Sequence, residues 1–134
     1  MGKIGVFLYS GFQEMEFWYP VLRLREIGAD VVVIGVEGRE ATASVLDYPV
    51  VPHLALAETT PGDYAALIIP GGNVARLAED AAFRTFVREA AARRVRLMAA
   101  SQAAALVSGS EALVAATTDD VPRITRTLIE ELQS

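Results

Sequence analysis

Four short, predominantly apolar segments constrain the fold of this chain more than any other feature of its sequence. They span residues 4–9, 31–34, 64–69 and 95–100, and a glycine, proline or serine follows within two residues of each. A strand that is apolar on both faces must be covered on both sides, which is typical of a parallel sheet enclosed by helices. The segments therefore predict buried strands, and residues 113–117 predict a last short strand.

Stretches with helical periodicity separate these strands. Phe17, Val21 and Leu24 share one stripe of residues 14–27, and a second amphipathic stretch covers 83–91. A closing helix follows Asp119 and Asp120, both good N-cap residues. This alternation predicts an α/β fold with a doubly wound, mostly parallel sheet flanked by helices, a flavodoxin-like three-layer sandwich.

Length and composition indicate one domain over residues 1–134. The chain has 52% apolar and 22% charged residues, which is enough to bury one core. Its net charge of −5, with Lys3 as the only lysine, argues against nucleic acid or an anionic membrane as partner. No segment approaches the roughly 18 apolar residues of a membrane span, nor the apolar region of a signal peptide. We therefore expect a cytoplasmic protein.

The chain contains no cysteine and one histidine, His53. Disulfides, thiolate metal sites and a cysteine nucleophile are excluded, and so is a site built from several histidines. No phosphate-binding glycine motif is present, so we expect neither a metal nor a cofactor. His53 fits a solvated loop; a triad with Ser101 requires that loop to fold over the sheet edge.

The carboxyl ends of the strands are where ligands bind in doubly wound folds. Ser101 follows one such strand, with small residues at Ala99 and Ala103, as a nucleophile on a tight strand-to-helix turn requires. The amide of Gln102 would then face an oxyanion near the hydroxyl. Serine is also a good N-cap, so a purely structural role remains open.

A second strand ends in Pro70-Gly71-Gly72-Asn73, where the two glycines let backbone amides approach a ligand or simply allow a sharp turn. Glu14 and Glu16 lie at the start of the first helix, where the helix dipole stabilises acidic side chains, so neither residue needs a further role. Glu16 also lies between Met15 and Phe17, so its burial would make it a hydrogen-bond donor to a neighbour.

Five segments together resemble the ThiJ/PfpI superfamily, the DJ group of cysteine-dependent proteases, amidases, glyoxalases and stress proteins, which is related to class I glutamine amidotransferases. They are residues 11–16, 24–31, 63–73, 99–101 and 119–122. The resemblance implies that Ser101 stands at the position of the nucleophilic cysteine, that Glu16 is its acidic partner, and that the amides of Gly72 and Gln102 are oxyanion donors. The residues expected to line the site are Gly71, Asn73 and Ala103.

Two departures from the family pattern shape the functional prediction. Serine replaces cysteine, and a hydroxyl needs an adjacent base to become a nucleophile. The chain also passes quickly through residues 108–111, where family members carry a longer segment. We therefore predict a ThiJ/PfpI-like protein without the family's cysteine-dependent activity.

Two alternatives remain open. One is a serine-dependent hydrolase of the amidase, esterase or peptidase type that uses Ser101. The other is a non-catalytic binding or regulatory module. The expected ligand is a small carbonyl compound, an amide or a peptide. The apolar composition and the resemblance both favour a homo-oligomer, a dimer being the expected form.

Overall fold

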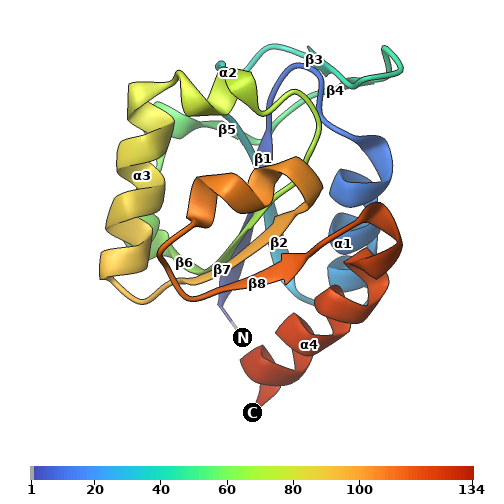
Figure 1. The fold of residues 1–134 in the computed structure, drawn as a ribbon, viewed down its shortest axis with the longest axis vertical. Helices are drawn as coiled ribbons and strands as arrows, with labels where there is room; N and C mark the ends of the chain where they lie inside the picture. The colour runs from blue at the N-terminus through green and yellow to red at the C-terminus, as the bar shows by residue number, and fades with distance from the viewer. Residues whose placement is uncertain (1) are drawn as a thin grey trace.

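A computed structural model describes residues 2–134 and has a six-stranded sheet at its centre (Figure 1). The strand order is β5-β2-β1-β6-β7-β8, and all five pairings are parallel. The strands are β1 (Lys3–Leu8), β2 (Asp30–Gly35), β5 (Leu54–Ala55), β6 (Tyr64–Ile69), β7 (Arg96–Ala100) and β8 (Ala112–Ala115). The predicted doubly wound α/β fold is confirmed.

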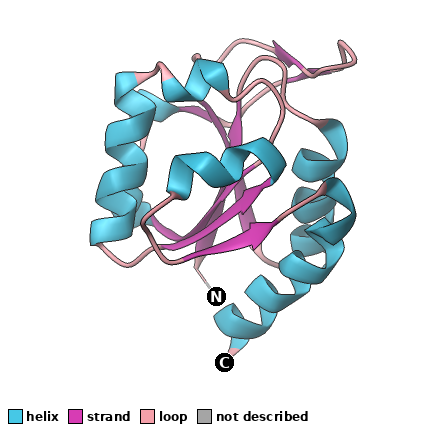
Figure 2. Cartoon of the chain, in the orientation of Figure 1, coloured by secondary structure: helices cyan, strands magenta, loops and turns pink. Residues whose placement is uncertain are grey.

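Helices cover both faces of this sheet (Figure 2). The helices α1 (Glu14–Glu26) and α4 (Val121–Gln133) pack against each other on one face. The other face carries α2 (Ala75–Ala78), α3 (Ala81–Ala92) and the 3₁₀ helix η3 (Ser101–Val107). After β1 the chain adds β2 and β5 on one side of that strand, and it then crosses over to add β6 on the other side. This reversal creates the crevice in which doubly wound proteins bind ligands.

The core lies on both sides of the central strands. From Ile4 onward β1 is buried throughout, and Phe7 packs edge-on against Phe83 and Phe86 of α3, with ring centroids 5.0 and 5.8 Å apart. On the opposite face Phe17 and Leu24 of α1 are fully buried. The apolar stripe predicted from helical spacing therefore faces the sheet.

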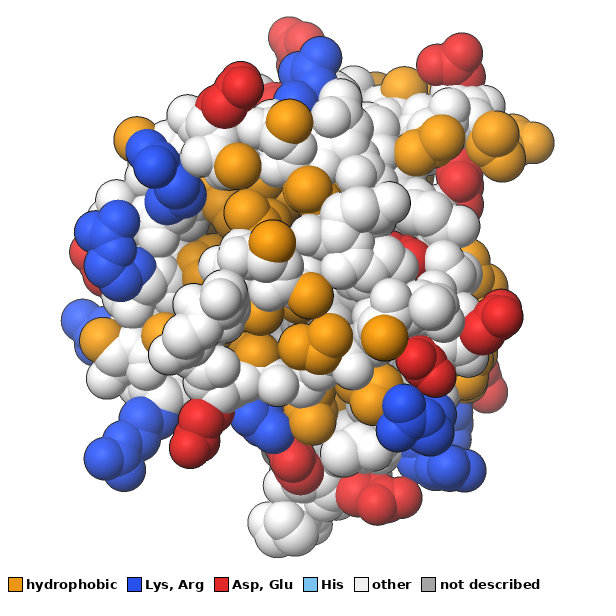
Figure 3. Space-filling view, in the orientation of Figure 1, with side chains coloured by type: hydrophobic (Ala, Val, Ile, Leu, Met, Phe, Trp, Pro, Cys, Tyr) orange, Lys and Arg blue, Asp and Glu red, His pale blue; other side chains and the backbone are white. Residues whose placement is uncertain are grey.

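The weakly patterned segment between β2 and β6 forms an antiparallel hairpin of β3 (Thr42–Ala43) and β4 (Pro49–Val50). Val50 lies in β4, whereas Val45 lies between the two strands. The hairpin exposes several large apolar side chains, which gather at its end of the molecule (Figure 3). They are Val45, Leu46, Tyr48 and Val51.

The closing helix begins differently from the expected capping pattern. Asp120 is the N-cap residue of α4, but among the described residues its side chain makes no capping hydrogen bond. It pairs instead with Arg123 at 3.4 Å, and the short 3₁₀ turn η4 (Thr118–Asp120) leads into the helix. No helix within residues 2–134 is long and apolar enough to cross a membrane.

Candidate functional site

Four chain segments meet at the carboxyl edge of the sheet. They follow β1, β6, β7 and β8, which are neighbours in the strand order, so their exits lie side by side. In Figure 1 the start of η3 lies next to the first turn of α1, although the two are far apart in sequence. This convergence brings together residues that were predicted separately.

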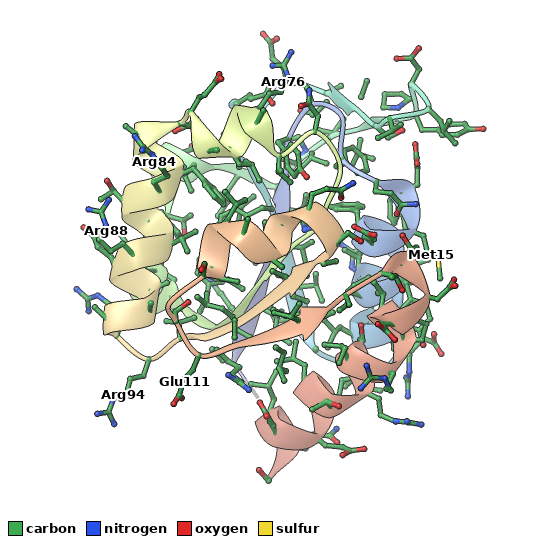
Figure 4. The ribbon with its side chains drawn as sticks, in the orientation of Figure 1. Met15, Arg76, Arg84, Arg88, Arg94 and Glu111 are labelled. Atoms are coloured by element: carbon green, nitrogen blue, oxygen red, sulfur yellow. The ribbon has the colours of Figure 1, made fainter. Side chains whose placement is uncertain are left out.

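Glu16 is the centre of this cluster. It lies in the first turn of α1, whose N-terminus is capped by the Gln13 side chain, which accepts from the Glu16 amide at 2.7 Å. The Glu16 side chain is buried, with 2% of the residue exposed, whereas its neighbour Met15 points outward (Figure 4). The local helix geometry therefore turns Glu16 toward the sheet.

Three donors surround the Glu16 carboxylate. Its Oε1 accepts from the Gly71 amide at 2.8 Å, and its Oε2 accepts from Ser101 Oγ at 2.5 Å and from Thr118 Oγ1 at 2.6 Å. Both oxygens of the carboxylate therefore act as acceptors. The sequence suggested that buried Glu16 would donate, whereas in the structure it accepts from all three partners.

Ser101 occupies a strained turn at the end of β7. Its backbone φ is +49°, a left-handed conformation that is uncommon for residues other than glycine. Such strain is typical of a side chain held at a sharp strand-to-helix turn, and the small neighbours predicted for it are present. The turn directs the hydroxyl at Glu16.

The Gly71–Gly72 turn accepts only glycine for steric reasons. A Cβ on Gly71 would lie 2.5 Å from Glu16 Oε1 and 2.8 Å from the Ala100 carbonyl oxygen, and one on Gly72 would lie 2.3 Å from the Gly11 carbonyl oxygen. Gly72 also has a φ of +123°. The two glycines therefore let the backbone after β6 approach the acid and the β7 exit closely.

The Gly72 amide is already occupied. It donates to the side-chain oxygen Oε1 of Gln102 at 3.1 Å, so the two residues expected to supply oxyanion donors contact each other. Gln102 was predicted to act through its backbone amide, and the contact of its side chain was not anticipated. An external oxygen acceptor must displace this carboxamide to reach the Gly72 amide.

Tyr9 holds the Pro70–Gly72 turn through a hydrogen bond. Its hydroxyl is buried and donates to the Pro70 carbonyl oxygen at 2.7 Å. Burial, together with the negative charge of Glu16, raises the pKa of Tyr9 well above its ordinary value. The phenol therefore stays protonated and keeps its hydrogen bond to the turn.

The remaining predicted residues lie at different depths. Asn73 is exposed and its backbone amide donates to the Gly11 carbonyl, whereas Ala103, a residue of η3 itself, is fully buried. His53 lies beside β2, where Nδ1 accepts from the Val33 amide at 2.8 Å. Because β1 and β6 separate β2 from β7, this position does not support a triad with Ser101.

Thr118 is the site residue that the sequence interpretation missed. It follows β8, the one strand of the four whose exit was not considered, and its hydroxyl contacts the same carboxylate oxygen as Ser101. The rule that ligand sites follow parallel strands applies equally to the Thr117-Thr118 pair. The signal was present in the polar residues after the last apolar strand.

Fold and site together define a doubly wound α/β protein with a serine-bearing elbow and a buried acid. The sequence matches the DJ-1/PfpI family over residues 2–132. The chain therefore belongs to the DJ-1/PfpI family, which confirms the resemblance seen in its motifs.

Curated relatives match part of the chain. It is 34% identical over 70 residues to an uncharacterised protein of Archaeoglobus fulgidus, and 33% identical over 82 residues to a protein of Thermococcus kodakarensis named a deglycase. These matches cover 52% and 59% of this chain, and 41% and 49% of the relatives. The match thus spans less than half the length of each relative.

Solved structures show the same fold over nearly the whole chain. Drosophila melanogaster DJ-1beta superposes with a TM-score of 0.90 at 18% identity, covering 98% of this chain and 90% of that one. A DJ-1 superfamily protein of Salmonella typhimurium, solved as a cysteine-to-alanine mutant, gives 0.89 at 23% identity, with coverages of 99% and 91%. At these identities the likeness concerns the fold.

Proposed function

We propose that this protein keeps the ligand-binding scaffold of the DJ-1/PfpI family, with Ser101 at the position of the family's cysteine, and lacks cysteine-dependent protease, amidase and glyoxalase activity. The observation that carries this proposal is the chemical identity of the group that meets Glu16 Oε2 at 2.5 Å, which is the Ser101 hydroxyl and not a thiol. A thiol ionises near pH 8.5, and at a lower pH in a favourable site. A hydroxyl stays protonated and reacts only with help from a base.

The surroundings of the hydroxyl support this proposal. The Glu16 oxygen that accepts from Ser101 also accepts from Thr118, and the other oxygen accepts from the Gly71 amide. His53, the single histidine of the chain, is engaged with β2. The Gly72 amide is covered by Gln102, so stabilising an oxyanion there requires a prior rearrangement. The expected ligand is a small carbonyl compound, an amide or a peptide.

Turnover assays test the proposal directly. The substrates are methylglyoxal, chromogenic peptide and ester compounds, and a glycated amine, which the name of the Thermococcus relative suggests. We expect the parent protein and Ser101→Ala to show the same background rate, and Ser101→Cys to gain reactivity toward iodoacetamide. Turnover by the parent that is lost in Ser101→Ala would overturn the proposal.

A serine-dependent hydrolase is the second candidate, and the same short contact favours it. Glu16 would take the proton of the Ser101 hydroxyl while Oγ attacks the substrate carbonyl carbon. The C–N or C–O bond of the substrate then breaks, Glu16 returns the proton to the departing amine or alcohol, and an acyl-enzyme is left. Water hydrolyses this ester to a carboxylic acid and restores the Ser101 hydroxyl. A fluorophosphonate probe distinguishes the two candidates. Labelling of the parent but not of Ser101→Ala or Glu16→Gln supports the hydrolase, and an unlabelled parent excludes it for this probe class.

We also propose that the protein forms a homodimer through the β3–β4 hairpin. Leu46 and Tyr48 are 67% and 61% exposed there, and monomers seldom leave several large apolar side chains together in water. Light scattering should show a dimer for the parent and a smaller species for Leu46→Asp. Val114→Asp, at a 40% exposed position on β8, is the matched control and should remain dimeric. A monomeric parent at high concentration would contradict the proposal.

A further inference from the structure

Two consecutive backbone amides of the Gly71–Gly72 turn each donate to a side-chain oxygen, which we call the cap of that amide. The Gly71 amide donates to Glu16 Oε1 at 2.8 Å, and the Gly72 amide donates to Gln102 Oε1 at 3.1 Å. A Cβ placed on Gly71 would lie 2.5 Å from the first oxygen and 2.7 Å from the second. Both oxygens therefore crowd the same short piece of backbone.

The two caps differ in what holds them. Glu16 is buried and is fixed by two further hydrogen bonds from Ser101 and Thr118. Gln102 is exposed, its carboxamide is uncharged, and its contact with Gly72 lies at the surface. A neutral hydrogen bond in contact with water contributes little net free energy and exchanges readily with other acceptors. The Gln102 cap is therefore the replaceable one.

We propose that the Gln102 carboxamide is a reversible internal occupant of a carbonyl-binding position on the Gly72 amide. The same position takes the carbonyl oxygen of an external amide, aldehyde or ketone when Gln102 swings away. The inference rests on the proposed function only in treating Ser101 and the Gly71–Gly72 turn as one site. Gln102 thereby sets the affinity of the site for such ligands.

The charge of the neighbouring acid selects among external acceptors. A ligand oxygen on the Gly72 amide sits next to the carboxylate oxygen on the Gly71 amide. A carboxylate ligand would bring a second negative charge into that position, and like charges this close repel each other. An uncharged carbonyl oxygen, which the Gln102 side chain itself presents, avoids this repulsion. The site should prefer acetamide to acetate.

Titration of ¹⁵N-labelled protein with acetamide, followed at the Gly72 amide resonance, tests this inference. In Gln102→Ala and in the size-matched Gln102→Met the competing oxygen is gone, so the free Gly72 resonance should shift and acetamide should bind about three- to tenfold tighter than to the parent. Gln133→Ala removes an exposed glutamine at the end of α4 and is the matched control, with parental shift and affinity. Acetate should bind each protein more weakly than acetamide.

Two results would overturn the inference. One is an unchanged Gly72 resonance and acetamide affinity in both Gln102 variants, and the other is tighter binding of acetate than of acetamide. Neither depends on turnover, so failure of this inference is distinguishable from failure of the proposed function. Ser101-dependent turnover with a clear Gln102 effect on binding would remove the proposed lack of activity and leave the carbonyl-binding position intact.

Discussion

The Gly71 and Gly72 amides lie in two halves of one candidate site, and these halves differ in burial, charge and number of contacts. The Gly71 half is buried, charged and cross-linked, since one carboxylate joins segments from α1, β6, β7 and β8. The Gly72 half is exposed, neutral and held by a single side-chain contact. The comparison teaches that the scaffold of the site is fixed by the acid, whereas access to it depends on a replaceable glutamine.

The largest expected effect comes from removing the acid. Glu16→Ala deprives the Gly71 amide and the hydroxyls of Ser101 and Thr118 of their acceptor, and each unsatisfied donor costs about 1–3 kcal/mol. We expect a loss of about 3 kcal/mol in the free energy of unfolding, measured by urea denaturation.

Two variants calibrate that loss. Glu16→Gln keeps the side-chain volume and one acceptor oxygen, so it should cost about 1 kcal/mol. Glu26→Ala removes an exposed glutamate from the same helix and should change stability by less than about 0.5 kcal/mol. A Glu16→Ala protein as stable as Glu26→Ala would show that the buried half is not cross-linked by the acid.

The next effect concerns the close approach of backbone and acid. Gly71→Ala places a methyl group where Glu16 Oε1, Gln102 Oε1 and the Ala100 carbonyl already lie, and overpacking of this kind costs about 1–3 kcal/mol. Gly62→Ala is the matched control, because a Cβ there meets only Arg93 at 3.7 Å. It should be neutral or slightly stabilising. Equal melting temperatures for the two variants would contradict the described turn geometry.

A smaller effect separates Thr118 from its neighbour. Thr118→Val removes one of the three donors to Glu16 and should lower the free energy of unfolding by about 1 kcal/mol. Thr117→Val alters the exposed preceding residue, whose side chain makes no capping bond among the described residues, and should have almost no effect. Reversal of this order would remove Thr118 from the site.

The smallest effect provides a reference for an exposed contact. Arg96 on β7 holds Glu131 on α4 through its guanidinium, and this hydrogen bond lowers the pKa of Glu131. A lowered pKa stabilises the fold above the unfolded-state pKa of about 4.3. That stabilisation is lost as the pH falls through the folded-state pKa.

Glu131→Gln should therefore cost about 0.5 kcal/mol at pH 7, with the difference fading below about pH 4. Urea denaturation at several pH values measures it. A cost of several kcal/mol, or one that grows with acid, would show that this exposed pair resembles the buried half instead.

The fold was predictable because its strands carry local signals. Residues of β1, β2, β6 and β7 are apolar on both faces, and the stripe of α1 contains Phe17 and Leu24 in helical register. By contrast, β5 has two residues and pairs at only two register positions, so no local pattern indicated it. Tertiary pairing with β2 alone makes that strand.

Most of the residues that meet around Glu16 could be named from the sequence, whereas their contacts could not. Strand exits and motif resemblance pointed to Glu16, Ser101 and the two glycines. The direction of the Glu16 hydrogen bonds depends on donors 55, 85 and 102 residues away, which no local pattern encodes. The Gln102 cap depends likewise on how closely the β6 and β7 exits approach, which only the packed structure determines.

Hydrogen exchange at the Gly71 and Gly72 amides, measured in a single experiment, tests the contrast between the two halves most directly. We predict that Gly71 exchanges only through large-scale unfolding, because its acceptor is buried and held by two other segments. Gly72 should exchange orders of magnitude faster, through local release of Gln102. Equal protection of the two amides would contradict the account.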